Sequence, residues 1–265
     1  MSPIYEPKGK ARGYSPLALN FYNGCDHGCT YCFNKRFKYF TDNPVLKKNF
    51  FANLLKDAKK LAGTNKQVLL CFSGDPYCKK DVVLQATRRV LEILLLYKIP
   101  TAVLTKGGER CLRDLDLFKQ FGEGIKIGAS LTFSDPEHSK HYEPGAALPE
   151  ERFQTLKTLH DAGIRTWVSL EPVINIKQTL AIIDITHPYV TEYKIGKLNG
   201  YRLEKNNPFG FNCNHNWKYF LNEAVSRMRM YNKQFYVKKE LREFDKTLKL
   251  YPHEIDQDYL TVKSF

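Results

Sequence analysis

The sequence predicts an α/β fold whose strands run parallel. Short apolar runs alternate with segments of helical spacing, and this alternation repeats about six times along the 265 residues. Parallel strands need long crossover connections, which are usually helices. The order of elements is therefore typical of a closed or partial βα barrel, or of a doubly wound sheet. In each of these architectures ligands bind at the carboxyl ends of the strands.

Strands are expected where the apolar runs are short, and helices where apolar residues recur every three or four positions. The expected strands are residues 17–22, 67–73, 100–105, 125–133, 164–170 and 191–198. The expected helices are residues 46–62, 82–97, 110–121, 149–162 and 214–231. Gly63, Gly122 and Gly163 follow three of these helices, as C-terminal glycines do, and Asp81 is the expected N-cap of the second.

The composition is strongly basic. Lysine and arginine together number 41, whereas aspartate and glutamate number 28, which gives a net charge of +13 and a pI near 9.3. This surplus favours a polyanionic partner, and nucleic acid first among them. A basic surface that binds nothing would have the same composition.

The sequence shows no sign of secretion or membrane insertion. The N-terminal segment "MSPIYEPKGKARGYSP" lacks the apolar stretch of a signal peptide, and the longest apolar run, residues 91–97, is too short to span a bilayer. Seven cysteines is an odd number, which argues against a disulfide framework. We therefore expect a soluble, cytoplasmic and monomeric protein without a membrane partner.

Three cysteines lie close together in the segment "GCDHGCTYCFN", at positions 25, 29 and 32. Four thiolates close a zinc or iron–sulfur site, whereas three leave one metal position open. His27 is within the same loop and is a possible fourth ligand for zinc, although paired C-x-x-C motifs are the more usual zinc spacing. The residues alone leave three alternatives: a zinc site, a cluster open on one side, or a coincidence of unliganded thiols.

The spacing C-x-x-x-C-x-x-C, with Tyr31 before the last cysteine, resembles the signature of radical S-adenosylmethionine (SAM) enzymes. In that family three cysteines bind three irons of a [4Fe–4S] cluster, and the fourth iron binds the amino and carboxylate groups of SAM. One electron then cleaves SAM to methionine and a 5′-deoxyadenosyl radical, which abstracts hydrogen from the substrate. The resemblance implies Cys25, Cys29 and Cys32 as cluster ligands, SAM as cofactor, and an external electron donor such as flavodoxin or ferredoxin.

A longer resemblance points to one branch of that family. The segments "LNFYNGCDHGCTYCF", "FSGDPY", "VLTKGGERCLRDLDLF", "SLTFSD" and "YEPGAALPEERFQTLKTLHDAGIRTWVSLEPV" are similar to those of spore photoproduct lyase and DNA-repair-photolyase-like proteins. They extend across residues 17–173. The resemblance implies a partial (βα)6 barrel of the TIM type. A radical SAM core at residues 1–200 and a short C-terminal extension at 201–265, packed on it, are expected.

The same resemblance implies a set of SAM contacts. Tyr31 would lie near the adenine, Asp75 near the amino group, and Lys106 would pair with the carboxylate. Ser73 would bond the methionyl end or the ribose, and Ser130 the ribose or the carboxylate. The alternatives are a solvated loop lysine for Lys106 and backbone-bonded strand serines for the other two.

Four further residues are candidates with two readings each. Glu143 and Arg152 either form a scaffold ion pair or reach into the SAM site, and Glu171 either binds the ribose or binds the substrate. Cys71 matches a lyase cysteine that returns a hydrogen atom to the product radical. Strand alternation would place it on the same face as Ser73. The alternative for Cys71 is a small buried apolar residue.

The resemblance fades beyond residue 175, where basic and aromatic residues are interleaved in a pattern that favours a nucleic-acid track. These residues are Lys194, Lys197, Arg202, Lys205, Arg227, Arg229, Lys233, Lys238, Lys239, Arg242, Tyr193, Tyr201, Phe235 and Tyr236. The favoured function is a radical SAM enzyme that repairs or modifies nucleic acid. The alternatives are a radical SAM enzyme that modifies a peptide or protein, and a zinc-stabilised nucleic-acid-binding protein without catalysis.

Overall fold

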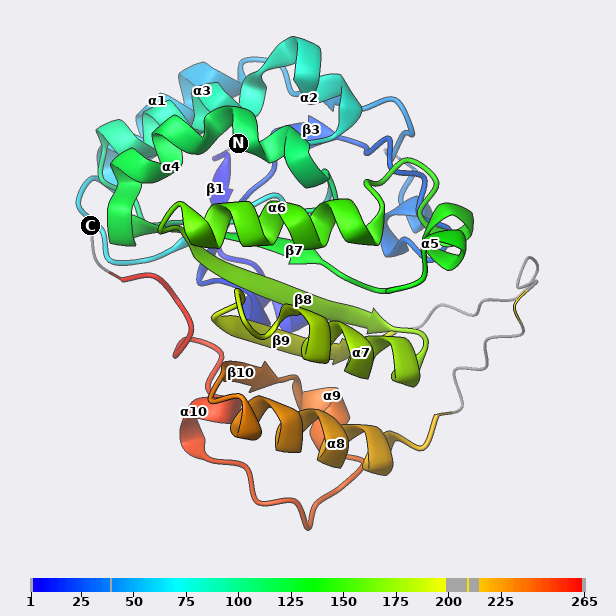
Figure 1. The fold of residues 1–265 in the computed structure, drawn as a ribbon. Helices are drawn as coiled ribbons and strands as arrows, with labels where there is room; N and C mark the ends of the chain where they lie inside the picture. Colours follow the sequence, from blue (N-terminus) through cyan, green and yellow to red (C-terminus); the bar gives the residue numbers. More distant parts are fainter. Residues whose placement is uncertain (1, 39, 199–208, 210–214, 264–265) are drawn as a thin grey trace.

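One curved, mostly parallel sheet forms the centre of the molecule (Figure 1). The computed structural model describes residues 2–38, 40–198, 209 and 215–263. The sheet order is β1 (Ile4–Tyr5), β2 (Leu17–Leu19), β5 (Val68–Leu70), β6 (Thr101–Thr105), β7 (Ile125–Ser130), β8 (Arg165–Val173), β9 (Glu192–Lys197) and β10 (Gln234–Val237). All neighbours from β2 to β10 pair in parallel, and β1 pairs antiparallel with β2. A separate ribbon joins β3 (Tyr22–Asn23) to β4 (Val45–Leu46).

All six strands predicted from the sequence are present, and the α/β fold with a partial barrel is confirmed. A further strand, β10, extends the sheet beyond β9, with Phe235 opposite Tyr193. Residues 234–237 therefore belong to the same sheet as the core, while the boundary at 200 stays a prediction. Among the described residues, the two edges of the sheet, β1 and β10, are not paired with each other.

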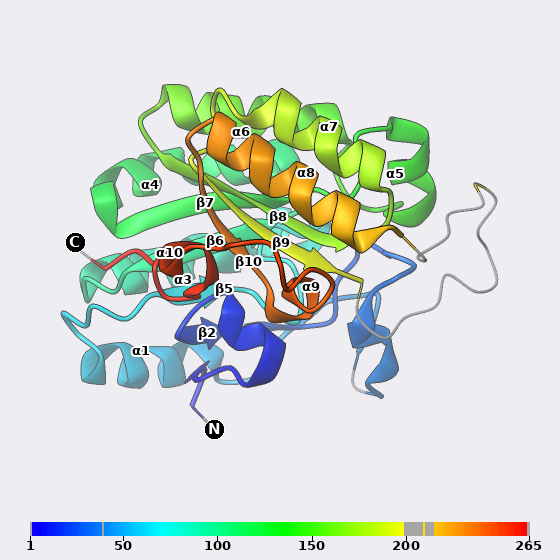
Figure 2. The same ribbon diagram turned by 90° about the horizontal axis from the view of Figure 1, so that it is seen from below.

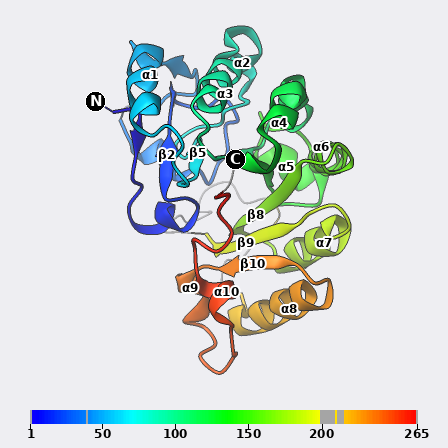
Figure 3. The same cartoon turned by 90° about the vertical axis from the view of Figure 1, so that its left-hand side faces the viewer.

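Helices cover the outer face of the sheet (Figures 1 and 3). The longer ones are α1 (Phe50–Lys60), α3 (Ala86–Leu96), α4 (Leu115–Phe121), α5 (Pro136–Tyr142), α6 (Pro149–Asp161), α7 (Ile176–Thr186) and α8 (Trp217–Met230). The shorter ones are α2 (Lys79–Leu84), α9 (Lys239–Arg242) and α10 (Pro252–Ile255). Four 3₁₀ segments are η1 (Gly9–Gly13), η2 (Phe33–Arg36), η3 (Gly108–Asp114) and η4 (Gly122–Gly124).

The predicted helix at 82–97 is two helices, because Gln85 between α2 and α3 has a left-handed backbone with φ of 47°. Asp81 is accordingly not an N-cap at the start of a helix. It is fully buried, accepts hydrogen bonds from Tyr22 Oη at 2.5 Å and Thr87 N at 3.1 Å, and pairs with Arg113.

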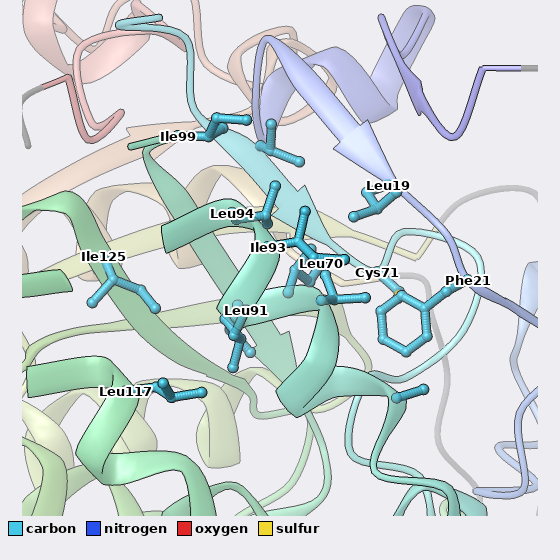
Figure 4. Close-up of a cluster of buried hydrophobic side chains, with 14 of the residues drawn as sticks. Leu19, Phe21, Leu70, Cys71, Leu91, Ile93, Leu94, Ile99, Leu117 and Ile125 are labelled. Carbon is cyan, nitrogen blue, oxygen red and sulfur yellow. The ribbon is translucent and has the colours of Figure 1, made fainter. Parts of the chain in front are cut away.

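Apolar side chains fill the layer between the sheet and the helices. Figure 4 shows the cluster on one half of the sheet, where Leu19 and Leu70 face Leu91 and Leu94 of α3. A second cluster lies between the strands from β7 to β10 and the helices α7 and α8. Burial of these faces holds each strand in register with its neighbours, because a slip of one residue would expose the apolar set.

The concave side of the sheet is filled by one large aromatic residue and by charged groups. Trp167 is fully buried against Ala18, Leu69 and Ala102, and a Cβ on Gly128 would lie 2.5 Å from its indole ring. Two buried lysines lie on the same side. Lys126 Nζ is 2.6 Å from Glu192 Oε1, and Lys194 Nζ donates to the carbonyls of Gly13 and Tyr14, each at 2.9 Å.

The C-terminal segment runs toward the middle of the curved sheet (Figure 3), and Figure 2 shows it passing from α10 toward the C-terminus. Lys126 Nζ donates to the Leu260 carbonyl, and Val262 N donates to Gln67 Oε1 at 2.9 Å. Arg12 forms a bidentate ion pair with Asp258, in which Nη1 lies 2.6 Å from Oδ1 and Nη2 lies 2.8 Å from Oδ2. These contacts tie the two ends of the chain together at the open side of the sheet. No helix of the described residues is long and apolar enough to cross a membrane.

Candidate cluster and cofactor site

The cysteine loop follows β3 and is held by backbone hydrogen bonds to two other parts of the chain. Cys25 N donates to the Thr41 carbonyl at 3.0 Å, and Thr30 N donates to the Tyr142 carbonyl at 2.9 Å. Gly24 has a φ of 96°, and a Cβ there would lie 2.1 Å from the Thr41 carbonyl oxygen, so only glycine fits. Protein contacts thus hold the loop in place, with all three cysteines partly exposed.

The three thiols fit a cluster with one open iron, because the histidine beside them is engaged elsewhere. His27 is 2% exposed, its Nδ1 lies 3.1 Å from the Gly145 carbonyl, and its Nε2 lies 3.0 Å from Asp75 Oδ2. Among the described residues, no three His, Cys, Asp or Glu side chains converge as ligands of a single metal ion. Thiols of a [4Fe–4S] cluster bind different irons and need not converge in this way.

Burial disfavours the charged form of two of these thiols, Cys25 and Cys29. It raises the pKa of Cys29 to about 12, helped by nearby Glu143, and it raises the pKa of Cys25 well above its usual range. Metal ligation requires the thiolate, so binding of iron would release these protons.

Asp75 connects the cysteine loop to the carboxyl ends of β5 and β6. Its Oδ1 accepts from Tyr77 N at 2.8 Å and from Thr105 Oγ1 at 2.6 Å, and its Oδ2 accepts from Lys106 N at 2.7 Å. Burial alone would raise the pKa of Asp75, but His27 and these donors outweigh it and lower the pKa. The carboxylate is therefore occupied by protein groups, which favours a positioning role. Its contact with the SAM amino group stays a prediction.

Glu143 is the centre of a buried charged group at the end of the cysteine loop. Glu143 and Arg152 are each 1% exposed, and Arg152 Nη2 lies 2.5 Å from Glu143 Oε2, so the pair expected from the sequence forms. Lys106 Nζ lies 3.4 Å from Oε1, and Tyr31 Oη donates to the same oxygen. Burial would raise the pKa of Glu143, but the Arg152 and Lys106 charges outweigh it and lower the pKa to about 2.

This group brings three residues that were predicted to contact SAM together at the carboxyl ends of the strands. Lys106 Nζ lies 5.8 Å from the centre of the Tyr31 ring, and Arg152 Nη1 donates to the Ser130 carbonyl at 2.8 Å. The side chain of Lys106 is 12% exposed, so it is neither the solvated loop lysine of the alternative reading nor fully enclosed. Tyr31, Lys106 and Ser130 thus share one network, although their contact with SAM is untested.

The two predicted serines keep their hydroxyls available. Within the described part of the chain, neither Ser73 Oγ nor Ser130 Oγ has a hydrogen-bond partner, and both residues are partly exposed. The backbone of Ser73 is held by Asn20, whose Oδ1 accepts from Phe72 N at 2.7 Å and Ser73 N at 2.8 Å. Asn20 was missed from the sequence. Its signal is a polar residue inside an otherwise apolar strand segment.

Glu171 lies at the end of β8 in a second polar group. It accepts hydrogen bonds from Lys238 Nζ and from Tyr14 Oη, and Tyr14 Oη is 2.8 Å from Ser169 Oγ. Lys238 follows β10 and Tyr14 precedes β2, so Glu171 links the end of β10 to the segment before β2. Tyr14 was also missed from the sequence, because no motif surrounds it. The expected ribose or substrate contact of Glu171 stays a prediction.

Cys71 follows the end of β5 at Leu70, so strand alternation does not fix the face on which its side chain lies. Cys71 packs in the apolar layer beside Phe21 and Leu70 (Figure 4) and is 5% exposed. Phe72 instead packs with Tyr14 toward the concave side, with ring centres 5.7 Å apart. Burial raises the pKa of the Cys71 thiol well above its usual range. This packing favours the small buried residue over the hydrogen donor.

Comparison with known proteins decides the family. The sequence model of the Radical SAM superfamily matches residues 19–185, which include the cysteine loop and the strands from β3 to β8. This chain belongs to the radical SAM superfamily. Its cofactors are therefore a [4Fe–4S] cluster and SAM, and the donor set of three thiols, with no fourth protein ligand beside them among the described residues, fits that cluster.

Two relatives in sequence are uncharacterised proteins. One from Methanocaldococcus jannaschii is 26% identical over 227 residues, which cover 80% of this chain and 85% of that protein. One from Mycobacterium tuberculosis is 28% identical over 167 residues, 59% of this chain and 49% of that protein. The chain thus matches about half the length of the mycobacterial protein.

Two solved structures share the fold of this radical SAM protein. A cysteine-to-serine variant of spore photoproduct lyase has a TM-score of 0.67 at 13% identity, over 88% of this chain and 78% of that one. SuiB of Streptococcus suis, bound to S-adenosylmethionine, has a TM-score of 0.63 at 13% identity, over 88% and 53%. Such low identity shows the fold and leaves the substrate open.

Proposed function

We propose that this radical SAM enzyme repairs or modifies a nucleic acid, in the manner of a spore photoproduct lyase. The observation that carries the proposal is the net charge of +13, which suits a polyanionic substrate. The likeness in fold to spore photoproduct lyase supports it, and one structure of that enzyme holds a dinucleoside spore photoproduct. The proposed activity is of the lyase type or modifies the nucleic acid. The proposed electron donor is an external protein such as flavodoxin or ferredoxin.

The structure corrects the expected nucleic-acid track. Tyr193, Lys194, Phe235 and Tyr236 are buried in the core or on the concave side of the sheet, so they offer no stacking surface. Arg227 pairs with Glu223 of its own helix and with Asp184 of α7, and Arg229 pairs with Glu254 of α10. Tyr201, Arg202 and Lys205 lie outside the described residues. Of the basic residues in the expected track, those that are at least partly exposed are Lys197, Lys233, Lys239 and Arg242.

The chain's own residues would bind and orient the cofactors. Cys25, Cys29 and Cys32 would hold the cluster, which with bound SAM supplies the radical that abstracts hydrogen from the substrate. Lys106, with its ammonium at the carboxyl ends of the strands, would bind the SAM carboxylate, while the Ser73 and Ser130 hydroxyls would donate to SAM oxygens. Glu143 and Arg152 would act through Tyr31 and Lys106, since both are buried behind them.

The test is the yield of 5′-deoxyadenosine from anaerobically reconstituted enzyme with SAM and a reductant. Separate reactions contain no addition, undamaged DNA, ultraviolet-irradiated DNA, bulk RNA, or a mixture of peptides. Stimulation by irradiated DNA alone would indicate repair, and stimulation by undamaged polymer would indicate modification. Equal yields in every reaction, or stimulation by peptides alone, would refute the nucleic-acid substrate.

Lys106→Met with Lys119→Met as control tests the binding role. Each change removes one lysine charge, but Lys106 follows β6 whereas Lys119 is exposed on α4. Loss of the Lys106 charge is expected to raise the SAM concentration needed for half-maximal cleavage at least tenfold, while the iron content of this variant stays at the wild-type level. The Lys119 variant is expected to need the same SAM concentration as wild type. An unchanged requirement for SAM would exclude Lys106 as the carboxylate ligand.

A further inference from the structure

A cleft is lined by residues of η1, by Tyr236 at the end of β10, and by Lys238 and the residues that follow it. It has a volume of about 370 Å³ and lies between η1, the end of β10, α9 and the segment after α10. Its lining includes Lys10, Tyr236, Lys238, Lys239, Arg242 and Gln257, and we call it the basic cleft. Its volume is at the small end of the range for ligand sites, enough for one nucleotide unit but not for a length of duplex.

The lining of the basic cleft carries more positive than negative charge. Lys10, Lys238, Lys239 and Arg242 are cationic, and Glu240 is the acidic side chain of the lining. Lys10 Nζ lies 3.1 Å from Glu240 Oε1, and Lys238 donates to Glu171. Two cations are thereby compensated. Lys239 and Arg242 form no ion pair with any side chain in the described part of the chain, so their charges remain for a ligand.

Arg242 is also short of an acceptor. Its side chain is partly buried, and its Nε is enclosed with no hydrogen-bond partner among the described residues. An enclosed donor without an acceptor costs about 1–3 kcal/mol, and more when the group is charged. A guanidinium presents paired N–H groups that match two oxygens of a phosphate. An anion with several oxygens in the cleft would therefore satisfy both the charge and the geometry of Arg242.

The basic cleft adjoins the end of the sheet at which the superfamily chemistry takes place. Lys238 forms part of its wall, directly follows β10, and donates to Glu171 at the end of β8. A strand of nucleic acid anchored in the cleft would lie beside the carboxyl ends of β8, β9 and β10. A neighbouring nucleotide of that strand could then approach the concave side of the sheet.

We propose that the basic cleft binds a backbone phosphate of a single-stranded nucleic acid, with Arg242 and Lys239 as its principal ligands. This inference rests on the proposed function, because it assigns to the nucleic-acid substrate a contact outside the cofactor site. The phosphate carries no sequence information, so the cleft sets the position of the strand rather than the choice of base.

The experiment measures anisotropy of a fluorescein-labelled single-stranded DNA oligonucleotide with the anaerobic holoenzyme over a range of salt concentrations. The variant is Lys239→Gln with Arg242→Gln. The control, Lys59→Gln with Lys60→Gln, makes the same change of net charge at exposed positions of α1. Each phosphate contact to a single strand contributes about 0.7 to the slope of log affinity against log salt. Loss of two contacts is thus expected to lower the slope by about 1.4 and the affinity by about 25-fold at 0.1 M salt.

A second variant guards against misfolding. Gln257→Glu places a carboxylate on the cleft wall with nearly the same shape and leaves Arg242 in place, and it is expected to weaken binding by at least fivefold. Iron content, thermal unfolding and 5′-deoxyadenosine formation without substrate should match wild type in all three variants. Inorganic pyrophosphate serves as a competitor, and it should displace the oligonucleotide only at concentrations far above that of the oligonucleotide.

The outcomes separate the cleft from the proposed function. Loss of affinity in the cleft variants, with wild-type affinity in the α1 control, would support phosphate binding in the basic cleft. Wild-type affinity in the cleft variants, or an equal loss of affinity in the α1 control, would refute phosphate binding by the cleft. Neither result would contradict the proposed nucleic-acid substrate. Tight pyrophosphate binding that depends on Arg242, with unchanged oligonucleotide binding, would assign the cleft to a free phosphate and also overturn its assignment to a backbone phosphate. If wild type binds no oligonucleotide, the proposed function fails first.

Discussion

Glu143→Gln is expected to destabilise the protein although it changes only one carboxylate oxygen to an amide. Glu143 accepts from Arg152 at 2.5 Å and from Tyr31, with Lys106 at 3.4 Å, and all of it is enclosed. Without its negative charge, Arg152 becomes an uncompensated buried cation. Its bonds to the carbonyls of Ala147 and Ser130 persist, at 2.7 and 2.8 Å, and soften the effect.

Two lines of reasoning give the same size of effect. Removal of one partner from a buried ion pair costs about 3–5 kcal/mol, and the surviving carbonyl contacts favour the lower figure. Independently, the pKa of Glu143 falls from 4.5 to about 2 on folding, which corresponds to about 3 kcal/mol at neutral pH. We therefore expect a loss of about 3 kcal/mol in the free energy of unfolding and a fall in Tm of about 6–12 °C.

The assay is urea unfolding of the metal-free protein, so that cluster binding does not contribute. The stabilisation from a carboxylate with a lowered pKa is present above pH 4.5 and is lost as the pH falls toward 2. The difference in the free energy of unfolding between wild type and variant should therefore be largest at pH 7 and decrease below pH 4.5. Glu137→Gln breaks an exposed pair with Lys140 and should cost less than about 0.5 kcal/mol. A Glu143 variant as stable as this control would refute the reasoning.

Three further predictions concern the cluster and the core. Cys29→Ala should lose most of the iron and all 5′-deoxyadenosine formation on reconstitution, whereas Cys111→Ala, fully buried elsewhere, should keep both; equal iron in the two variants would contradict the assignment. Cys71→Ala should keep iron content and product identity and lose about 1–2 kcal/mol of stability; a changed product would instead identify it as the hydrogen donor. Gly128→Ala should cost about 1–3 kcal/mol in thermal unfolding because its Cβ meets Trp167, and a wild-type Tm would disprove the contact.

The strands could be predicted because each is a short apolar run with turns on both sides. The exception is β10, whose four residues "QFYV" are followed at once by two lysines. Its place in the sheet depends on pairing with β9, which no local pattern reveals. The helix α7 was missed for a related reason: "IKQTLAIIDIT" is rich in β-branched residues, whose preference for strands conceals helical spacing.

The site was predictable where a motif is local and unpredictable where partners come from afar. The cysteine spacing and the Glu143–Arg152 pair are separated by few residues, and both carry recognisable patterns. His27 looked like a zinc ligand because its partner Asp75 lies 48 positions along the chain. The face of the Cys71 side chain could not be predicted because alternation holds only while a strand continues, and β5 ends one residue before it.

The ties across the open side of the sheet bear on how the chain acquires its structure. Arg12 pairs with Asp258 across 246 positions, and Gln67 binds Val262 across 195. Contacts of such separation make folding slow, and during synthesis the chain emerges from its N-terminus. The cysteine loop and its neighbours can therefore assemble early, whereas the contacts of residues 258–262 with Arg12, Lys126 and Gln67 form late in folding.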